Sequence, residues 1–324
     1  MRYNFSKRKT ALPLPNLSSM QIDSYEWLKT VGILEVLDEL GTISDYTGRG
    51  WTISLANPKI DKSNMSEEEA LYTGRTYDAP WYLRAVLKDE ITKKQKTQTI
   101  YMGDMPLMTK RGTFIINGIE RVVINQLTRS AGVLFTGEFS PVTGKFLAGA
   151  KILPKNGVWL EFETSRTGVV SVKIDRRRKI AATTLLRVFG LETDDAIRDA
   201  FSGVDSDPEV SFIDATLAKD PASSIEEAAI EIYRKMRPGE PLILENAQSL
   251  VESMFFNARR YSLGEVGRFM LNRKLELNFP DETKFFLLQL EDLIKIISNI
   301  ITLNNGIGEP DDIDHLGNRR VRSV

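Results

Sequence analysis

The chain has 324 residues, of which 42% are hydrophobic and 27% are charged, and its formal net charge at pH 7 is −1. This length predicts about two domains of ordinary size, and the apolar fraction lets each of them bury a core. The near-zero net charge excludes a protein that is basic over its whole surface. Binding of a polyanion would therefore have to come from local patches.

The sequence contains no cysteine, which excludes disulfides, zinc–thiolate sites and cysteine nucleophiles. The single histidine, His315, excludes a metal site built on two histidines. The N-terminal residues lack the apolar segment of a signal peptide. The most apolar stretch, LEDLIKIISNIITL, is short and carries Glu291, Asp292 and Lys295. We therefore expect a cytoplasmic protein with no membrane-spanning segment.

The first part of the chain predicts an extended arm, a helix and a β-rich region. Residues 1–20 contain Pro13 and Pro15, which disfavour helix. The stretch that begins at Ser18 and Ser19, either of which can act as the N-cap, has helical spacing up to residue 40. Its apolar stripe consists of Ile22, Tyr25, Leu28, Ile33, Val36 and Leu37. Strands are predicted over residues 51–56, 81–87 and 97–103.

The clearest local signal is Asn117-Gly118, which lies between two β-branched runs and predicts a hairpin with a type I′ turn. Further strands are predicted over 144–153, 157–165 and 168–175, and helices over 181–190, 223–239, 245–260 and 281–306. Gly190 is expected to end the first of these helices, and Ser224 with Glu227 to form a capping box. Strands followed by strands and then helices predict an α+β fold in two mixed domains, with a boundary near 126–133.

Two clusters allow both a structural and a functional interpretation. The run KIDRRRK (173–179) is either a solvated strand end or an edge that contacts phosphates, since arginine binds phosphate bidentately. Trp159, on the preceding strand, is either a core residue or a surface on which an unpaired base stacks. The lysine-rich segment TKKQKTQTIYM (92–102) is either a protected sheet edge or an edge to which a partner adds a strand.

The acidic clusters do not predict a metal site. Asp194, Asp195, Asp205 and Asp207 are expected to form a solvated face. The cluster DDIDH (311–315) follows a glycine-containing loop rather than a rigid element, so we predict no metal there. His315 is expected to be structural, within the turn DIDHLGN.

Several longer motifs carry a resemblance to a known family. They are PLPNLSSMQIDSYEWL, YMGDMPLMTKRGTFIINGIERVVINQL, RSAGVLF, VKIDRRRK, EIYRKMRPGEP, VGRFMLNRKL and DDIDHLGNRRVRSV. In this order they resemble the β subunit of bacterial-type, multisubunit DNA-directed RNA polymerase. The resemblance implies an N-terminal arm and the first part of the protrusion domain over 1–128, and the lobe domain over 129–313. Residues 314–324 would begin a return to the protrusion, because in the family the chain continues further.

The resemblance also implies binding sites. A pocket for a base of the non-template DNA strand would comprise Arg129, Trp159, Asp175, Ile313, Asp314 and Arg319. In it the indole would stack on the base, the carboxylates would accept from a guanine edge, and the arginines would hold phosphate or base. Arg121, Ile124 and Gln126 match a part of the rifamycin pocket beside the nascent RNA. Lys96, Thr97, Gln98, Thr99 and Ile100 match an edge that docks Tudor-like transcription or repair factors.

The family's chemistry is nucleotidyl transfer with two Mg²⁺ ions held by the companion largest subunit. The resemblance therefore implies no catalytic residue, no metal site and no cofactor in this chain, and no activity of the chain alone. Implied partners are DNA, nascent RNA, the largest subunit, the alpha dimer, omega and a sigma factor, and the implied location is the nucleoid. The residues leave two alternatives open: a stand-alone docking module using the 95–101 edge, and a carboxylate-dependent nuclease using the acidic cluster at 311–315.

Overall fold

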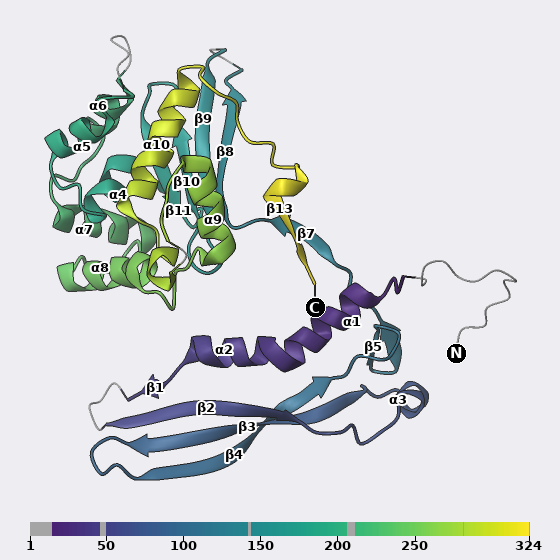
Figure 1. Ribbon diagram of the computed structural model, residues 1–324. Helices are drawn as coiled ribbons and strands as arrows, with labels where there is room; N and C mark the ends of the chain where they lie inside the picture. The colour runs from purple at the N-terminus through teal and green to yellow at the C-terminus, as the bar shows by residue number, and fades with distance from the viewer. Residues whose placement is uncertain (1–14, 46–49, 142–143, 206–210, 281, 324) are drawn as a thin grey trace, which may run out of the picture. The chain divides into compact units, whose positions relative to one another are not determined.

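The computed structural model describes residues 15–45, 50–141, 144–205, 211–280 and 282–323. It divides into two compact units, one with the residues up to Leu127 and those from Val321 onwards, the other with Thr128–Arg320. We call them unit 1 and unit 2. Each contains helices and antiparallel strands, which confirms the predicted α+β class (Figure 1). The division falls beside the expected boundary at 128/129, and the expected return segment is split between the units after Arg320.

Unit 1 begins with the helix predicted over residues 18–40. It consists of α1 (Ser19–Trp27), the π-helical η1 (Leu28–Gly32) and α2 (Ile33–Leu40). The expected arm therefore ends before Ser19, and its first 14 residues lie outside the described part of the chain. Two details were wrong. Ser18 occupies the N-cap position, but its side chain makes no capping hydrogen bond. Val36, which was expected in the buried apolar stripe, is 63% exposed, and α2 buries none of its residues.

The sheet of unit 1 contains the three strands that were predicted. In the order β1-β2-β3-β4 it is antiparallel and comprises β1 (Ile43–Ser44), β2 (Trp51–Ile60), β3 (Asp78–Asp89) and β4 (Gln95–Pro106). The hairpin of β5 (Phe114–Ile116) and β6 (Ile119–Arg121) is also confirmed. Its central residues Asn117 and Gly118 have φ of 51° and 73°, as a type I′ turn requires. The helix α3 (Glu67–Thr73), which Ser66 caps, was not predicted.

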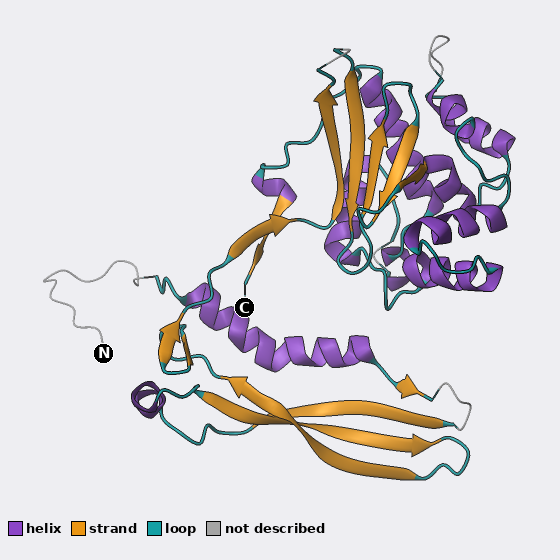
Figure 2. Ribbon diagram, turned by 180° about the vertical axis from the view of Figure 1, so that it is seen from behind, coloured by secondary structure: helices purple, strands orange, loops and turns teal. Residues whose placement is uncertain are grey.

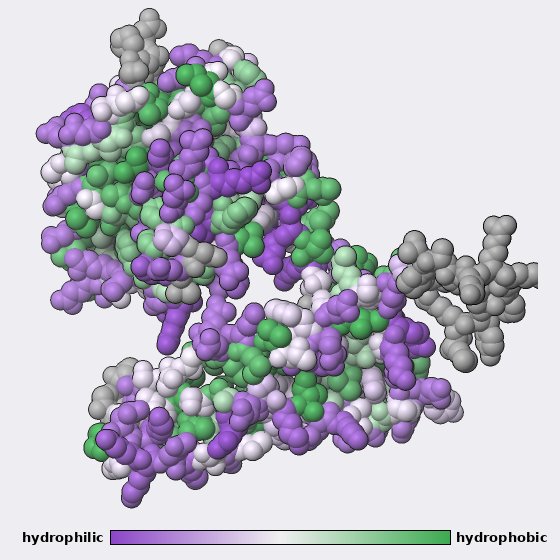
Figure 3. Space-filling view, viewed as in Figure 1, coloured by the Kyte–Doolittle hydropathy of each residue, from purple (hydrophilic) through white to green (hydrophobic). Residues whose placement is uncertain are grey.

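Unit 1 buries few side chains among the described residues. Tyr25 is the largest of them: its ring packs edge-on against Phe114, and its hydroxyl donates to the Pro106 carbonyl at 2.8 Å. Burial raises the pKa of this hydroxyl to about 12. Many large apolar side chains, among them Trp27, Leu34 and Ile124, instead reach the surface. Figure 3 shows hydrophobic residues among hydrophilic ones on the face of unit 1 that it draws. Unit 1 thus covers only part of its apolar surface with its own residues.

Unit 2 is built on a five-stranded antiparallel sheet in the order β12-β11-β10-β9-β8. Its strands are β8 (Gly132–Phe139), β9 (Phe146–Leu153), β10 (Leu160–Thr164), β11 (Val170–Ile174) and β12 (Lys179–Ala181). The three central strands were predicted, whereas β8 and β12 were not. The first four residues of β8 are all buried, so its sequence lacks the alternation that marks a half-buried strand.

The helices of unit 2 cover one face of this sheet, and no helix formed by the described residues lies on the other face (Figures 1 and 2). They are α4 (Ala182–Val188), α5 (Asp194–Phe201), α6 (Phe212–Leu217), α7 (Ile225–Met236), α8 (Leu244–Val251), η2 (Glu252–Phe256), α9 (Gly264–Leu275), η3 (Thr283–Phe286) and α10 (Leu290–Asn304). The four predicted helical segments are confirmed, while α5, α6 and α9 were not predicted. No helix among the described residues is long and apolar enough to span a bilayer.

The predicted helix ends are partly right. Gly190 follows α4 with a φ of 119°, as a residue beyond a helix end does. The Ser224 hydroxyl caps α7 by accepting from Glu227 N, but the Glu227 carboxylate accepts from Ser223 rather than completing the box. The last helix begins at Leu290 instead of residue 281, because a capping box of Gln289 and Asp292 starts it there.

The expectation that the acidic residues form a solvated face is right for Asp195, whose side chain is 90% exposed, but incomplete for Asp194 and Asp205, which also make structural contacts. Asp194 accepts a hydrogen bond from the buried guanidinium of Arg187. Asp205 accepts from the backbone of Phe212 and Ile213 at 3.1 and 2.8 Å and so caps α6. These carboxylates therefore hold the helices of unit 2 together. Asp207 lies outside the described residues.

A buried ion pair links α9 to α10 within the core of unit 2. Arg268, 1% exposed, donates to both carboxylate oxygens of the fully buried Asp292 at 2.7 and 3.0 Å. Its other donors reach the carbonyls of Phe285 and Leu287 at 2.6 and 2.7 Å. Four of the five N–H donors of the guanidinium are thus bonded to protein acceptors, which offsets the cost of removing the charge from water.

We predict that Asp292→Ala destabilises unit 2 by about 3–5 kcal/mol, because it leaves the guanidinium of Arg268 buried without its counter-ion. Urea unfolding followed by circular dichroism measures the change. The matched control is Asp195→Ala at the exposed pair with Arg198, where the loss should be about 1 kcal/mol or less. Equal losses for the two variants would contradict the prediction.

Candidate nucleic-acid interface

Trp159 and Asp175 are direct neighbours at one end of the sheet of unit 2. The backbone N–H of Asp175 donates to the carbonyl of Trp159 at 2.8 Å, which extends the ladder between β10 and β11 by one step. The indole is half-buried and the Asp175 side chain is exposed. Among the described residues the Asp175 carboxylate takes no hydrogen bond or ion pair, so both of its oxygens are available to donors from solvent.

The register of the sheet decides which way Trp159 faces. The row Val133, Ile152, Leu160 and Ile174 crosses four strands and points into the helical layer. Because successive side chains alternate between faces, Trp159 lies on the face that the helices leave open. Next to this row, Gly132 of β8 pairs with Leu153 of β9, and β10 follows β9 in the sheet. The start of β8 therefore lies two strand spacings, roughly 10 Å, from Trp159.

Arg129 precedes the start of β8. It is exposed and belongs to β7 (Gln126–Arg129), which pairs with β13 (Arg319–Arg322) in a two-stranded sheet. Within unit 2 the Ser130 N–H donates to the carbonyl of Asn318 at 2.9 Å. Arg129 directly precedes the donor Ser130, and Arg319 directly follows the acceptor Asn318. This one hydrogen bond therefore links the two arginines.

The segment 311–318, which includes η4 (Leu316–Asn318), is tied to β8 by Lys274. The ammonium group of this lysine donates to the Val133 carbonyl at 2.9 Å, to the Asp311 carboxylate at 2.8 Å and to the Asn318 side chain at 3.4 Å. Asp311 also exchanges backbone and side-chain hydrogen bonds with Phe135. Lys274 lies in the motif VGRFMLNRKL, but nothing in that motif indicates its role, because its partners are far from it along the chain.

Arg319 and Asp314 form an ion pair across the turn that Lys274 holds. Asp314 is exposed, Ile313 is half-buried, and the Nε of Arg319 is shielded from solvent without a hydrogen-bond partner. An unpaired buried donor is costly, so this guanidinium retains capacity for a further acceptor. The six residues expected to bind DNA all lie in unit 2, in two linked groups: Trp159 with Asp175, and Arg129 with the 313–319 segment.

His315 is structural, as predicted, because its Nδ1 accepts from the Gly317 N–H at 3.0 Å. The neighbouring carboxylates each serve the turn or its ion pairs: Asp311 with Lys274, Asp312 with the Asp314 N–H, and Asp314 with Arg319. In the described part of the chain no three histidine, cysteine or acidic side chains are placed to hold a metal ion.

The arginine run beside Trp159 is exposed from Arg176 to Arg178, and the guanidinium carbon of Arg176 lies 5.1 Å from the indole centroid. Lys173 and Lys179, on the open face, both pair with Glu163. Partial burial alone would raise the pKa of Glu163, but the hydrogen bonds from these lysines hold that pKa below its usual value. Glu163 is therefore paired with the two lysines and does not neutralise Arg176, Arg177 or Arg178.

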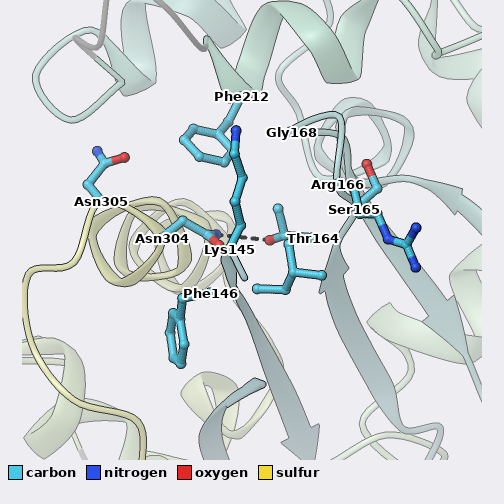
Figure 4. A pocket seen from close by; sticks show the side chains of 10 residues that line it. Lys145, Phe146, Thr164, Ser165, Arg166, Gly168, Phe212, Asn304 and Asn305 are labelled. Carbon is cyan, nitrogen blue, oxygen red and sulfur yellow. Dashed lines mark hydrogen bonds between the residues drawn. The ribbon is translucent and has the colours of Figure 1, made fainter. Parts of the chain in front are cut away.

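A hollow of about 400 Å³ lies at the opposite end of β10, lined by Lys145, Arg166 and Phe212 among others (Figure 4). Its floor is a structural link: the Asn304 side chain accepts from the Ala148 N–H at 2.9 Å and donates to the Thr164 hydroxyl at 3.0 Å. These polar groups are satisfied within the fold, at the other end of the strand from Trp159. The hollow is therefore not part of the candidate site at Trp159 and Asp175.

The two other expected sites lie in unit 1. Arg121, Ile124 and Gln126 are exposed in and after β6, and Ile124 is 77% exposed. Lys96, Thr97, Gln98, Thr99 and Ile100 lie in β4, and all are exposed. Since β4 is the last strand of its sheet and pairs with β3 alone among the described residues, its outer edge has free backbone groups.

Comparison with known proteins identifies the family. The family model described as RNA polymerase Rpb2, domain 2, matches residues 148–322, more than half of the chain. The chain belongs to the RNA polymerase β-subunit (Rpb2) family. A second model, described as RNA polymerase beta subunit, matches residues 16–155. The first match includes Trp159, Asp175 and Arg319, and the second includes β4 and Arg129.

Three relatives among the β subunits are similar along nearly the whole chain. Each is named DNA-directed RNA polymerase subunit beta. The protein of Chloroflexus aggregans is 40% identical over 100% of this chain, that of Dehalococcoides mccartyi 41% over 100%, and that of Gloeobacter violaceus 43% over 96%. The chain spans only 28%, 26% and 27% of these relatives' own lengths.

We predict that Lys274→Met releases the segment 311–318 from β8, since methionine retains the length of the side chain but none of its donors. Amide hydrogen exchange in residues 311–318 should become at least about tenfold faster, while β10 and β11 keep their protection. Lys284→Met is the control, because its pair with Glu282 is largely exposed. Unchanged exchange in the segment would show that Lys274 does not hold it.

Proposed function

We propose that the chain is part of the β subunit of a DNA-directed RNA polymerase and forms one wall of the cleft that holds DNA and RNA. Support comes from the family match over residues 148–322 and from relatives of 40–43% identity that carry this name. The activity is DNA-templated nucleotidyl transfer by the assembled enzyme. The two Mg²⁺ ions and the residues that bind them belong to the companion largest subunit, so this chain alone is inactive.

The open end of the sheet in unit 2 binds the non-template DNA strand. The observation that carries this proposal is the half-buried indole of Trp159 on the open face, beside an unpaired carboxylate and an arginine run. An unpaired base stacks on the indole, Asp175 accepts from the base edge, and Arg129 and Arg319 hold the phosphate. Asp314 orients Arg319 through their ion pair, and the half-buried Ile313 directly precedes Asp314 in the same pocket.

We predict that Trp159→Ala weakens discrimination at a single downstream non-template base in the assembled polymerase, because stacking on an aromatic ring contributes about 1–3 kcal/mol. Promoter-complex lifetime and pausing, measured with each of the four bases at each position, report the change. Trp159→Phe retains an aromatic face and should keep most of the discrimination. Identical lifetimes and pausing for all four bases in the wild-type and alanine enzymes would contradict the proposal.

The outer edge of β4 docks a transcription or repair factor of the Tudor-like class by addition of a strand. The free backbone groups of residues 96–100 and their exposed polar side chains support this assignment. Arg121, Ile124 and Gln126 form part of a rifamycin pocket beside the nascent RNA. The remaining partners are the largest subunit, the alpha dimer, omega and a sigma factor, in the cytoplasm at the nucleoid.

We predict that Thr99→Pro abolishes factor binding, because proline removes a backbone donor and disrupts the edge strand. A pull-down or calorimetric titration with a Tudor-like factor domain measures the loss. Thr99→Ala changes the side chain but keeps the backbone donor, and should bind nearly as wild type. DNA affinity should be equal in all three proteins, and factor binding retained by the proline variant would exclude this edge.

A further inference from the structure

The turn after β11 has an unfavourable backbone conformation for its sequence. The Arg177 N–H donates to the Ile174 carbonyl at 2.9 Å and closes a turn whose central residues, Asp175 and Arg176, have φ of 48° and 59°. Two consecutive left-handed residues define a type I′ turn, in which glycine is preferred at the second central position. Arginine there is strained by its β-carbon, so the local backbone does not explain why the position holds Arg176.

The side chain of Arg176 instead contacts Trp159. Its guanidinium lies over the indole at 5.1 Å from the ring centroid, within the range of a cation–π contact. The backbone of the same turn is bonded to Trp159 through the Asp175 N–H at 2.8 Å. The strained turn is therefore anchored to the residue that its arginine covers.

The guanidinium covers one face of the indole. Arg176 is exposed and Trp159 is half-buried, so both side chains reach solvent. A base can stack on that face only if Arg176 moves aside.

We propose that Arg176 is a displaceable cover on Trp159 that makes base stacking selective. This inference rests on the proposed stacking function of Trp159. A base that offers only its aromatic face exchanges one stacked group for another and gains little. Guanine alone has two adjacent N–H donors on its pairing edge, N1–H and the N2 amino group. These match the two oxygens of the Asp175 carboxylate next to the cover, so guanine displaces Arg176 most readily. A side chain that already occupies a binding surface lowers the net affinity of every ligand that must displace it. Only a ligand with additional contacts then binds well, which is a common route to specificity.

Arg176→Gly tests the inference in the assembled polymerase. Glycine suits the type I′ turn, so loss of folding is not expected. Arg177→Ala is the matched control, since it removes the same charge from the next residue, whose side chain does not cover the ring. Arg176→Lys keeps the charge but lacks the planar guanidinium that stacks.

The measurement uses a DNA bubble with 2-aminopurine at one non-template position at a time, because stacking quenches its fluorescence. Arg176→Gly should increase quenching at one position and reduce the ratio of complex lifetimes for guanine over the other bases by about three- to tenfold. Arg176→Lys should have an intermediate effect, and Arg177→Ala should leave both readouts as in wild type. Adding Trp159→Ala should remove the effect of Arg176→Gly.

Two results overturn the inference in different ways. If Trp159→Ala relieves quenching but Arg176→Gly behaves as Arg177→Ala does, stacking on Trp159 stands and the cover is excluded. If Trp159→Ala changes quenching at no position, the stacking function fails, and the proposed role of Arg176 fails with it.

Discussion

The register of the five-stranded sheet in unit 2 is the constraint on which its candidate site depends. One face of the sheet is buried under helices, and a shift of one residue in any strand would move that strand's apolar side chains to the open face. The row through Val133, Ile152, Leu160 and Ile174 therefore has one acceptable pairing. With that row in place, Trp159 and Asp175 necessarily meet at its end and on the uncovered side.

Two sets of polar contacts hold the surroundings of the sheet in position. The buried pair of Arg268 and Asp292 joins α9 to α10, and its hydrogen bonds offset the cost of removing both charges from water. Lys274, also on α9, binds Asp311 and Asn318 and so connects this helix to the segment at the surface. The turn that presents Asp314 and Arg319 thus depends on a helix of the core as well as on hydrogen bonds within its own sequence.

The two units differ in how completely they are stabilised by their own residues. Unit 2 has a continuous core that extends from Val133 to Leu303. Unit 1 buries Tyr25, Leu83 and Ile115 but leaves Trp27, Leu34 and Ile124 at the surface. The two units thus differ in how much of their apolar surface their own residues cover.

The sequence by itself determined the α+β class, the Asn117-Gly118 hairpin, the central strands of unit 2 and most of its helices, because each depends on local periodicity or turn chemistry. The motifs also carried the family resemblance, which named Trp159, Asp175 and Arg319. Only the tertiary structure decided which of these residues are neighbours, that Arg176 covers the indole, and that Lys274 holds the 311–318 segment. β8 escaped prediction because its first four residues are all buried and show no alternation, and α5 because its first turn, Asp194-Asp195, resembles an acidic loop in the sequence. Such contacts join residues far apart in the chain, so no local pattern encodes them.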